Sequence, residues 1–386
     1  MTKIPYSRQC LDAADIRAVV RVLKSPFLTQ GPEIEKFERE FAKFCGAKYA
    51  VACSSATAGL HLCALALGIG PGDVWWTSPN TFCATADAAL RCGADVDFID
   101  IEWGTYNMDL GLLEERLKLA AQKKRLPRVV APVHFAGNPV DMEFLGKLRK
   151  KYGFRVVEDA AHAAGASLRG ERVGSCKWSD LCVFSFHAVK IITTGEGGMV
   201  TTNSENLYEK LRLLRSHGIS REAKHRSSRQ KYPWYYEKLA LGNHYRMTDM
   251  QAALGRSQLS KISELNSKRK KLAALYDRHL PGWLILPKVT PGADSSWHLY
   301  VTLTPPAYRS RDLLLKKMGD NHIQGAVHYP PVPSLSFYRK KFPSRNFLKK
   351  CPKSMDYFQR AVSIPLFPQM SPHQVRRVAG VMEGRP

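Results

Sequence analysis

Residues 181–198 read LCVFSFHAVKIITTGEGG, and this stretch places a lysine just beyond a short apolar run. The run Leu181–Ser185 has the composition of a buried β-strand. Ligands of parallel α/β sheets gather beyond the carboxyl ends of the strands, so Lys190 marks a candidate site. Its neighbours are apolar or small, and desolvation is expected to turn its amine into a nucleophile for Schiff-base chemistry. A solvated surface lysine is the ordinary alternative for a lysine taken alone.

Two other predicted strands end in residues that suit the same site. The apolar run 49–53 is followed by Ser54-Ser55-Ala56-Thr57, a small-residue turn at a helix start whose N–H groups would favour a phosphate. A capped helix start explains this turn equally well. The run 154–158 is followed by Asp159, a carboxylate that is costly to bury without a partner. A protonated ring nitrogen would serve as that partner, and capping of the next turn is an equal alternative.

The three features together are more specific than any one of them. A phosphate anchor, an anion for a pyridinium and an amine for an aldehyde are what a pyridoxal-phosphate (PLP) site requires. The sequence therefore predicts that Lys190 and Asp159 meet near the turn that contains Ala56 and Thr57.

The order of apolar runs and helical patterns predicts the fold class. Helices are expected at 12–24, 32–44, 58–67, 81–90 and 142–151, and strands at 49–53, 74–77, 96–99, 128–135, 154–158 and 181–185. Such alternation is typical of an α/β fold with a mainly parallel sheet covered by helices. The pattern weakens after Asn203, and a long helical region is expected from about Met247 to Arg278. We expect a large domain at 1–247, a connecting helix at 248–280 and a small C-terminal α/β domain at 281–386.

Composition restricts the class of protein further. The chain has 58 Lys and Arg against 34 Asp and Glu, a net charge of +24, which attracts anions. The largest local excess, Arg221 to Lys231, is interpreted as a solvated basic loop because it lacks the motif of a nucleic-acid reader. No apolar run is long enough to span a membrane, and no signal peptide is expected. Nine scattered cysteines without CxxC spacing give little support to a metal site and fit a reducing cytoplasm.

The motifs SSATAGL, EDAAHA and FSFHAVKIITTGEGG, in that order, resemble the DegT/DnrJ/EryC1/StrS sugar aminotransferases. The segments LTQGP (28–32), GNHYRMTDMQAALG (242–255) and VHYPP (327–331) are also similar to that family, so the resemblance covers nearly the whole chain. It implies a PLP-dependent transferase of fold type I, the aspartate aminotransferase-like fold. The segments YSRQCLDAADIRAVVRVLKSPFLTQGP (6–32) and PWYYEKLALG (233–242) resemble the branch that makes the 4-amino sugar of pseudaminic acid biosynthesis.

The resemblance assigns roles to particular residues. Lys190 matches the lysine that forms the Schiff base with PLP, and Asp159 matches the carboxylate that faces the pyridine nitrogen. His162 lies where the family places a group near the phenolic oxygen, and Phe82 matches the aromatic residue stacked on the ring. For these two, a core histidine and a plain core aromatic are the alternatives. The resemblance also places phosphate contacts at Ala56, Thr57 and Ser185. Thr29 and His328 lie in segments that match substrate-binding ones. Tyr329, next to His328, could equally well serve in packing.

One motif departs from the family pattern. Relatives have Gly-x-Asn-Tyr-Arg-Met, whose Asn reaches the cofactor phosphate from the partner subunit, whereas this chain has His244 at that position. An imidazole can still donate to phosphate, and Asn243 is an alternative donor. The resemblance thus implies a homodimer with shared active sites.

The activity that the resemblance implies is transfer of the amino group of L-glutamate, which becomes 2-oxoglutarate, to the C4 keto group of a UDP-linked 4-keto-6-deoxy-N-acetylamino sugar. One site would serve both substrates in turn, by ping-pong kinetics through pyridoxamine phosphate. The alternatives are aminotransfer to another keto sugar or a keto-cyclitol, and a non-catalytic binding protein on the same fold. Loss of Lys190 or Asp159 would mark the non-catalytic protein, and histidine in place of Lys190 would mark a sugar dehydratase; neither is seen.

Overall fold

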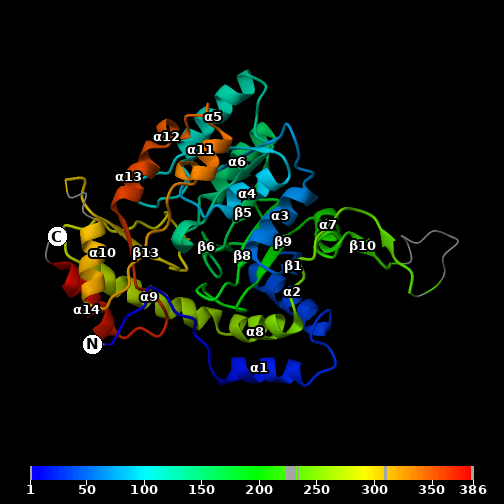
Figure 1. The fold of residues 1–386 in the computed structure, drawn as a ribbon, viewed down its shortest axis with the longest axis horizontal. Coiled ribbons are helices and arrows are strands. Elements are labelled where there is room, and N and C mark those ends of the chain that lie inside the picture. The colour runs from blue at the N-terminus through cyan, green and yellow to red at the C-terminus, as the bar shows by residue number, and fades with distance from the viewer. Residues whose placement is uncertain (1, 223–231, 233, 308–310, 384–386) are drawn as a thin grey trace.

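A seven-stranded sheet forms the centre of the computed structural model, which describes residues 2–222, 232, 234–307 and 311–383 (Figure 1). Its strand order is β1-β9-β8-β5-β4-β2-β3. The strands are β1 (Tyr49–Cys53), β2 (Val74–Thr77), β3 (Asp95–Phe98), β4 (Val129–Ala131), β5 (Arg155–Asp159), β8 (Leu181–Ser185) and β9 (Gly198–Thr202). All neighbours from β8 to β3 are parallel, and only β9 runs antiparallel to both β1 and β8. The predicted mainly parallel sheet is confirmed.

Helices cover both faces of this sheet because neighbouring residues of each strand point to opposite sides. On β8, Val183 packs in one apolar cluster with α3 (Ala56–Ala66), whereas Phe184 packs in another with α2 (Pro32–Cys45). The α3 face also holds α4 (Ala84–Arg91) and α7 (Glu205–Arg215). The α2 face also holds α5 (Leu110–Gln122), α6 (Met142–Tyr152) and α8 (Asp249–Leu259).

The first two helices begin where their sequence signals predict. The Asp12 side chain accepts hydrogen bonds from the amides of Ala14 and Asp15 and so caps α1 (Ala13–Leu23). Pro32 stands at the first position of α2, where its missing N–H costs nothing. Helix α1 lies along α8 through a small buried cluster and leaves other apolar side chains exposed.

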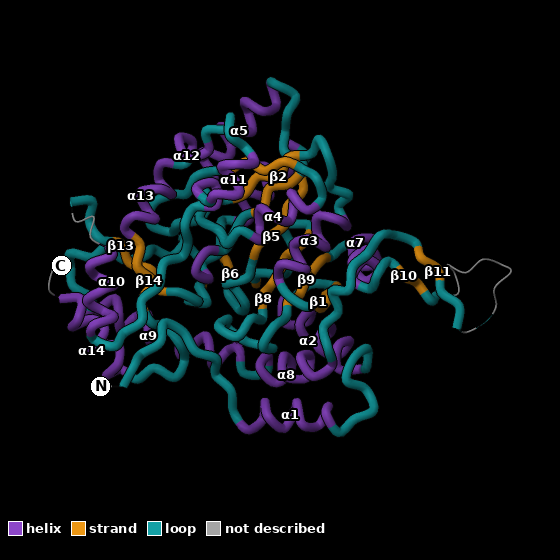
Figure 2. The backbone as a smooth tube through the Cα atoms, viewed as in Figure 1, coloured by secondary structure: helices purple, strands orange, loops and turns teal. Residues whose placement is uncertain are grey.

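The C-terminal part has its own apolar core around Tyr276, Tyr300 and Val378. Its elements are α9 (Ile262–His279), β12 (Ala293–Asp294), β13 (Tyr300–Leu303), α10 (Arg311–Asp320), α11 (Ser336–Lys341), α12 (Phe347–Lys350), α13 (Pro352–Arg360), β14 (Ala361–Ile364) and α14 (Pro372–Glu383). Strands β13 and β14 pair antiparallel, while β12 pairs with β6 (Ser167–Leu168), which in turn pairs with β7 (Glu171–Arg172). The short strands β10 (Ile219–Ser220) and β11 (Glu237–Lys238) form an arm that projects from the main body (Figure 2).

Two sequence expectations are wrong, and a third holds only in part. The strand expected at 128–135 ends at Ala131, because Pro132 has no N–H for the ladder, and the 3-10 turn η1 (Phe135–Gly137) follows. The alternation of sheet strands and helices ends after β9, as expected, although the sequence did not mark the helix α7, which begins at Glu205 behind the cap Ser204. The single long helix is two helices, because Lys261 lies outside both and binds the Asp12 and Asp15 carboxylates of α1, each at 2.7 Å.

Two further expectations concern particular segments. Most of the basic stretch 221–231 lies outside the described residues. Within the part of the chain that is described, we find no helix with the length and apolarity needed to cross a bilayer.

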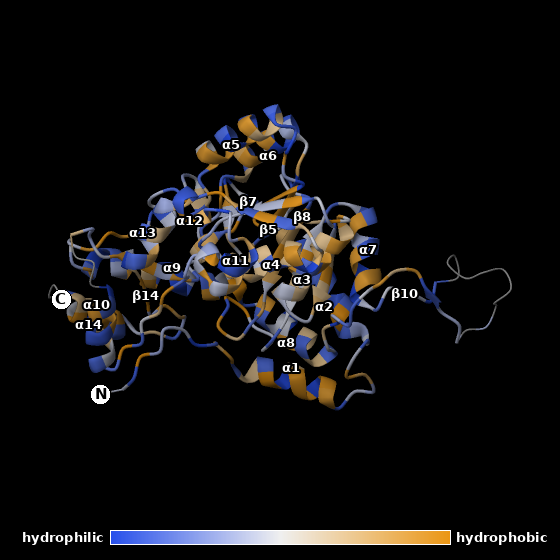
Figure 3. Ribbon diagram, turned by 45° about the horizontal axis from the view of Figure 1, so that its top comes forward, coloured by the Kyte–Doolittle hydropathy of each residue, from blue (hydrophilic) through white to orange (hydrophobic). Residues whose placement is uncertain are grey.

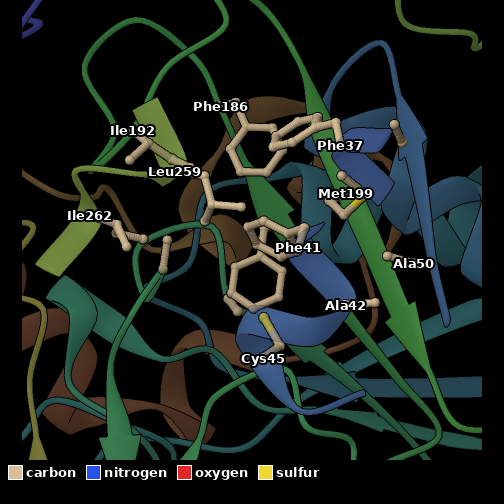
Figure 4. Close-up of a cluster of buried hydrophobic side chains, with 14 of the residues drawn as sticks. Phe37, Phe41, Ala42, Cys45, Ala50, Phe186, Ile192, Met199, Leu259 and Ile262 are labelled. Atoms are coloured by element: carbon tan, nitrogen blue, oxygen red, sulfur yellow. The ribbon is translucent and has the colours of Figure 1, made fainter. Parts of the chain in front are cut away.

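The loop between β8 and β9 is anchored by aromatic packing on both sides of Lys190. Phe186 and Ile192 are buried in the same cluster as Phe37 and Phe41 of α2 (Figure 4). The Phe186 and Phe41 rings meet edge to face with centroids 5.4 Å apart. This packing fixes both ends of the loop while leaving Lys190 itself only partly buried.

Candidate active site

A cavity of about 380 Å³ lies where β5 and β8 end and α3 begins. It is lined by side chains from widely separated segments, as expected at the carboxyl edge of a parallel sheet. Eight predicted site residues surround it: Ala56, Thr57, Phe82, Asp159, His162, Ser185, Lys190 and His328. Tyr6 and Glu196 also line the cavity; neither was predicted as a site residue, although Glu196 lies within the 181–198 stretch that contains Lys190.

Lys190 reaches this cavity from a turn in which its amide donates to the His187 carbonyl at 2.9 Å. Burial lowers the pKa of the Lys190 amine to about 8, and the Asp159 carboxylate opposes that shift. With such a pKa, roughly a tenth of the amine is neutral at pH 7, compared with less than a thousandth for an ordinary lysine. Lys190 lines the cavity and its pKa is lowered, so the structure favours a nucleophilic amine over a solvated surface lysine.

Asp159 ends β5 with both carboxylate oxygens occupied. Oδ1 accepts the Ala161 amide at 3.1 Å, and Oδ2 accepts the Thr85 hydroxyl at 2.5 Å. The two interpretations of this residue are thus compatible, because it caps the next turn and also lines the cavity. Thr85 was not predicted as a site residue; it is separated from Asp159 by 74 residues and belongs to α4.

The turn before α3 is built as a helix start that opens into the cavity. Ser55 caps the helix by accepting the Ala58 amide at 3.1 Å, and the first-turn amides of Ala56 and Thr57 have no acceptor within a helix. Gly198 of β9 lies directly behind this turn. A Cβ at Gly198 would stand 2.6 Å from the carbonyl carbon of Ser55 and 2.7 Å from the Ala56 nitrogen. The conformation of this candidate phosphate-binding turn therefore depends on having glycine at position 198.

His162 is a neutral hydrogen-bonding group of the cavity wall. Burial and the nearby Lys190 lower the pKa of His162 well below its usual range. Its Nδ1 accepts the Ala136 amide at 3.3 Å, so the proton of the neutral ring lies on Nε2, 3.2 Å from the Tyr329 hydroxyl. The ring thus makes ordinary buried hydrogen bonds and borders the cavity at the same time.

Two more histidines with lowered pKa values lie near His162: His328 lines the cavity, and His298 packs against the His162 ring. Burial lowers the pKa of His328 to about 4, and its Nδ1 lies 2.8 Å from the Ser363 hydroxyl. His298, which the sequence did not mark, places its ring 4.4 Å from that of His162, and burial also lowers its pKa. Tyr329, for which packing was an equal alternative, lines the cavity beside them.

Of Phe82 and Thr29, only Phe82 lines the cavity. Phe82 is 57% exposed and lines the cavity, so the plain core interpretation of this aromatic is wrong. Thr29 is exposed and pairs by a backbone bridge with Thr248, away from the residues that line the Lys190 cavity.

The departing motif residue also lies outside this cavity. His244 is exposed, and its ring packs at 5.4 Å against His217 beside the arm. A single chain therefore does not bring Thr29 or His244 to Lys190.

The residues around the cavity fit PLP. The α3 amides suit a phosphate, Asp159 suits a protonated ring nitrogen, and the amine of Lys190 suits an aldehyde. The exposed ring of Phe82 offers a stacking surface at the mouth. Among the described residues, no group of three His, Cys, Asp or Glu side chains is placed to hold a metal ion.

Comparisons with known proteins agree with this site. A curated relative from Bacillus subtilis, the spore coat polysaccharide biosynthesis protein SpsC, is 38% identical over 96% of this chain and 94% of its own. The UDP-4-amino-4,6-dideoxy-N-acetyl-beta-L-altrosamine transaminase of Campylobacter jejuni is 37% identical over 95% of this chain and 93% of its own length. The PLP form of a putative sugar aminotransferase from Streptococcus pneumoniae superposes with a TM-score of 0.87 at 28% identity, covering 99% of both chains.

The family model that matches is that of the DegT/DnrJ/EryC1/StrS aminotransferase family, over residues 9–383. The sheet, the lysine loop and the cofactor-sized cavity are the features such an enzyme needs. We conclude that this chain is a PLP-dependent sugar aminotransferase of fold type I and belongs to the DegT/DnrJ/EryC1/StrS family.

Proposed function

We propose that this aminotransferase moves the amino group of L-glutamate to the C4 keto carbon of a UDP-linked 4-keto-6-deoxy-N-acetylamino sugar, in a pathway of the pseudaminic acid type. The observation that carries the proposal is the 37% identity, over 95% of this chain, to a transaminase named for a UDP-linked 4-amino-4,6-dideoxy sugar. The cavity accommodates such chemistry, since it joins an amine, an acid and neutral hydrogen-bonding rings at one sheet edge.

The proposed roles follow from the contacts of each side chain. PLP, when bound, carries the amino group between the two substrates and takes the electrons of the reacting carbon into its ring. Lys190 provides the amine that holds the cofactor and, once released by an incoming amino group, moves a proton from the donor Cα. Asp159 would face the ring nitrogen of bound PLP, and the depressed pKa of His162 keeps that side chain an uncharged hydrogen-bond partner.

Exclusion of water gives these roles their strength. Asp159 and His162 are each only 5% exposed, so their interactions with a ligand act in a medium of low dielectric constant. Phe82 closes one side of the cavity and Tyr329 lies near it, with ring centroids 5.9 Å apart. A sugar would enter past these two aromatic rings.

We also propose a homodimer in which the partner completes the site. Apolar side chains remain exposed on α1 at Ile16 and Leu23, and beside the arm at Trp234 and Leu241, which is 85% exposed. Figure 3 shows by colour that α1 carries hydrophobic residues along its length. Exposed apolar residues of this number favour a protein interface. Such an interface would let the exposed His244 reach the phosphate of the partner's cofactor.

The free cysteines are consistent with a reducing cytoplasm, where we place the reaction. The division into residues 1–247, 248–280 and 281–386 also stays a proposal; the break at Lys261 falls within its middle segment.

A second acceptor is favoured by the relative from the spore coat pathway. SpsC is 38% identical over 96% of this chain, as similar as the altrosamine transaminase. The acceptor could thus be a different keto sugar, or a keto-cyclitol, with the same Lys190 chemistry.

The test is an absorbance spectrum of the purified protein during two successive additions. L-glutamate is expected to convert the bound cofactor to pyridoxamine phosphate, and the UDP-4-keto-6-deoxy-N-acetylamino sugar to restore the starting spectrum. A spectrum that glutamate changes and this sugar fails to restore would retain the aminotransferase and reject the acceptor. Failure to respond to glutamate, with recovery by another amino acid, would reject the donor.

A further inference from the structure

Thr85 of α4 is a fully buried hydroxyl whose partners all belong to the edge of the cavity. Its Oγ1 lies 2.5 Å from Oδ2 of Asp159 and 2.7 Å from the hydroxyl of Thr81. Thr81 is itself 2% exposed and lines the cavity next to Phe82, whereas Thr85 lies one layer behind. The hydroxyl therefore connects the acid of the site to the turn that carries its aromatic wall.

The direction of these hydrogen bonds follows from counting protons. Each threonine hydroxyl has a single proton, and a carboxylate can only accept. The proton of Thr85 therefore goes to Asp159, although the Phe82 carbonyl lies 3.3 Å away as a weaker acceptor. Thr81 must then donate to Thr85, so the chain runs from Thr81 through Thr85 to Asp159.

Helix α4 is held in place from its other side as well. The hydroxyl of Tyr338 in α11 donates to Asp87 of α4 at 2.5 Å, and Ala86 packs in the same cluster as Tyr338. The position of the Thr85 hydroxyl is therefore set by tertiary packing and does not depend on a ligand. Hydrogen bonds donated to an ionised group are shorter and stronger than those between neutral groups.

We infer that Thr85 is a positioning residue for the cofactor, because its hydroxyl holds the Asp159 carboxylate in the orientation that would face the ring nitrogen, while Thr81 orients the Thr85 hydroxyl. The inference rests on Asp159 facing the ring of bound PLP. It adds to the site a residue that touches neither substrate nor cofactor.

The test is PLP titration of the apoprotein, followed by absorbance, for Thr85→Val and Thr85→Ser. Thr85→Val keeps the shape and removes the hydroxyl, and PLP affinity is expected to fall about ten-fold or more, the range for hydrogen bonds to charged groups. Thr85→Ser is expected to bind within about threefold of the wild type. Thr77→Val is the matched control, since Thr77 is fully buried and its hydroxyl donates to the Ala131 carbonyl at 2.8 Å. Its PLP affinity should not change.

The same PLP titration in an Asp159→Asn background distinguishes a hydrogen bond to the Asp159 carboxylate from a general destabilisation of the cavity by Thr85→Val. There, Thr85→Val is expected to change PLP affinity by less than about threefold, because the charged acceptor is gone. Kinetically, Thr85→Val should lower kcat while leaving the KM for L-glutamate unchanged, since Thr85 does not line the cavity.

Two results would overturn the inference: wild-type PLP affinity in Thr85→Val, or an equal loss of affinity in the Asp159→Asn background. If Asp159→Asn fails to fold, the contrast between Thr85→Val and Thr85→Ser still decides, because equal affinity of the two rejects a role for the hydroxyl. Unchanged PLP affinity and turnover in Asp159→Asn itself would instead reject the role proposed for Asp159.

Discussion

Replacing Gly198 by alanine should damage cofactor binding, although this residue contacts the cavity only through the turn above it. The added Cβ would lie 2.6 Å from the Ser55 carbonyl carbon, whereas ordinary van der Waals contact begins at 3.4 Å. The two segments must therefore separate by about 0.8 Å, and because the atoms met are backbone atoms, no side chain can swing aside. A shift of that size is enough to break a hydrogen bond between an α3 amide and a phosphate.

The expected magnitude follows from this overlap. Overpacking of this kind costs about 1–3 kcal/mol, and we expect Gly198→Ala to lower the melting temperature and to weaken PLP binding about ten-fold or more. Gly380→Ala is the control, because Gly380 lies within α14 with nothing within 4 Å of the new Cβ; it should add about 0.5–1 kcal/mol of stability. The assays are thermal unfolding of the apoprotein and PLP titration. Wild-type PLP affinity in Gly198→Ala would refute the proposed dependence of the phosphate turn on this glycine.

Three more outcomes are expected from other parts of the molecule. The pKa of His328 is lowered to about 4, so between pH 6.5 and 4 the unfolded chain binds a proton that the folded chain excludes. Stability should therefore fall as the pH drops below 6.5, by about 1 kcal/mol from this histidine at pH 5.5, and urea unfolding of His328→Asn should show a shallower pH dependence. Arg269 is buried and donates to the carbonyls of Trp297, His298 and Leu366. Arg269→Met should then cost about 1–3 kcal/mol of unfolding free energy; an unchanged melting temperature would contradict this. Trp234→Ser, which removes a side chain that is 73% exposed, should shift sedimentation toward the monomer without lowering the monomer's stability.

The sheet could be predicted from the sequence because its strands are short apolar runs that end in turns. The strand Leu181–Ser185 has the predicted bounds, and Pro32 and Asp12 mark helix starts by their own chemistry. The pattern failed where tertiary contacts decide. Strand β9 runs antiparallel between β1 and β8. Nothing in the sequence Gly198–Thr202 indicates that it pairs with these two strands.

The residues of the candidate site also fall into those that the sequence could place and those that it could not. Residues next to strand ends, such as Asp159 and Lys190, could be placed because sheet topology brings those ends together. Thr85 and His298 could not, because their positions depend on how α4 and the 295–299 loop pack against distant strands. His244 is exposed in the single chain, so its predicted contact with the cofactor stays a prediction that requires the proposed homodimer.

The most direct test of the central claim is to follow the amino group itself. The purified enzyme is incubated with nitrogen-15-labelled L-glutamate and the UDP-4-keto-6-deoxy-N-acetylamino sugar, and the product is examined by NMR, with Lys190→Ala as the matched control. The account predicts labelled nitrogen on C4 of the sugar with the wild type and none with Lys190→Ala. Label transfer by Lys190→Ala at a rate near that of the wild type would contradict the account, as would a sugar that remains a ketone while another acceptor takes the label.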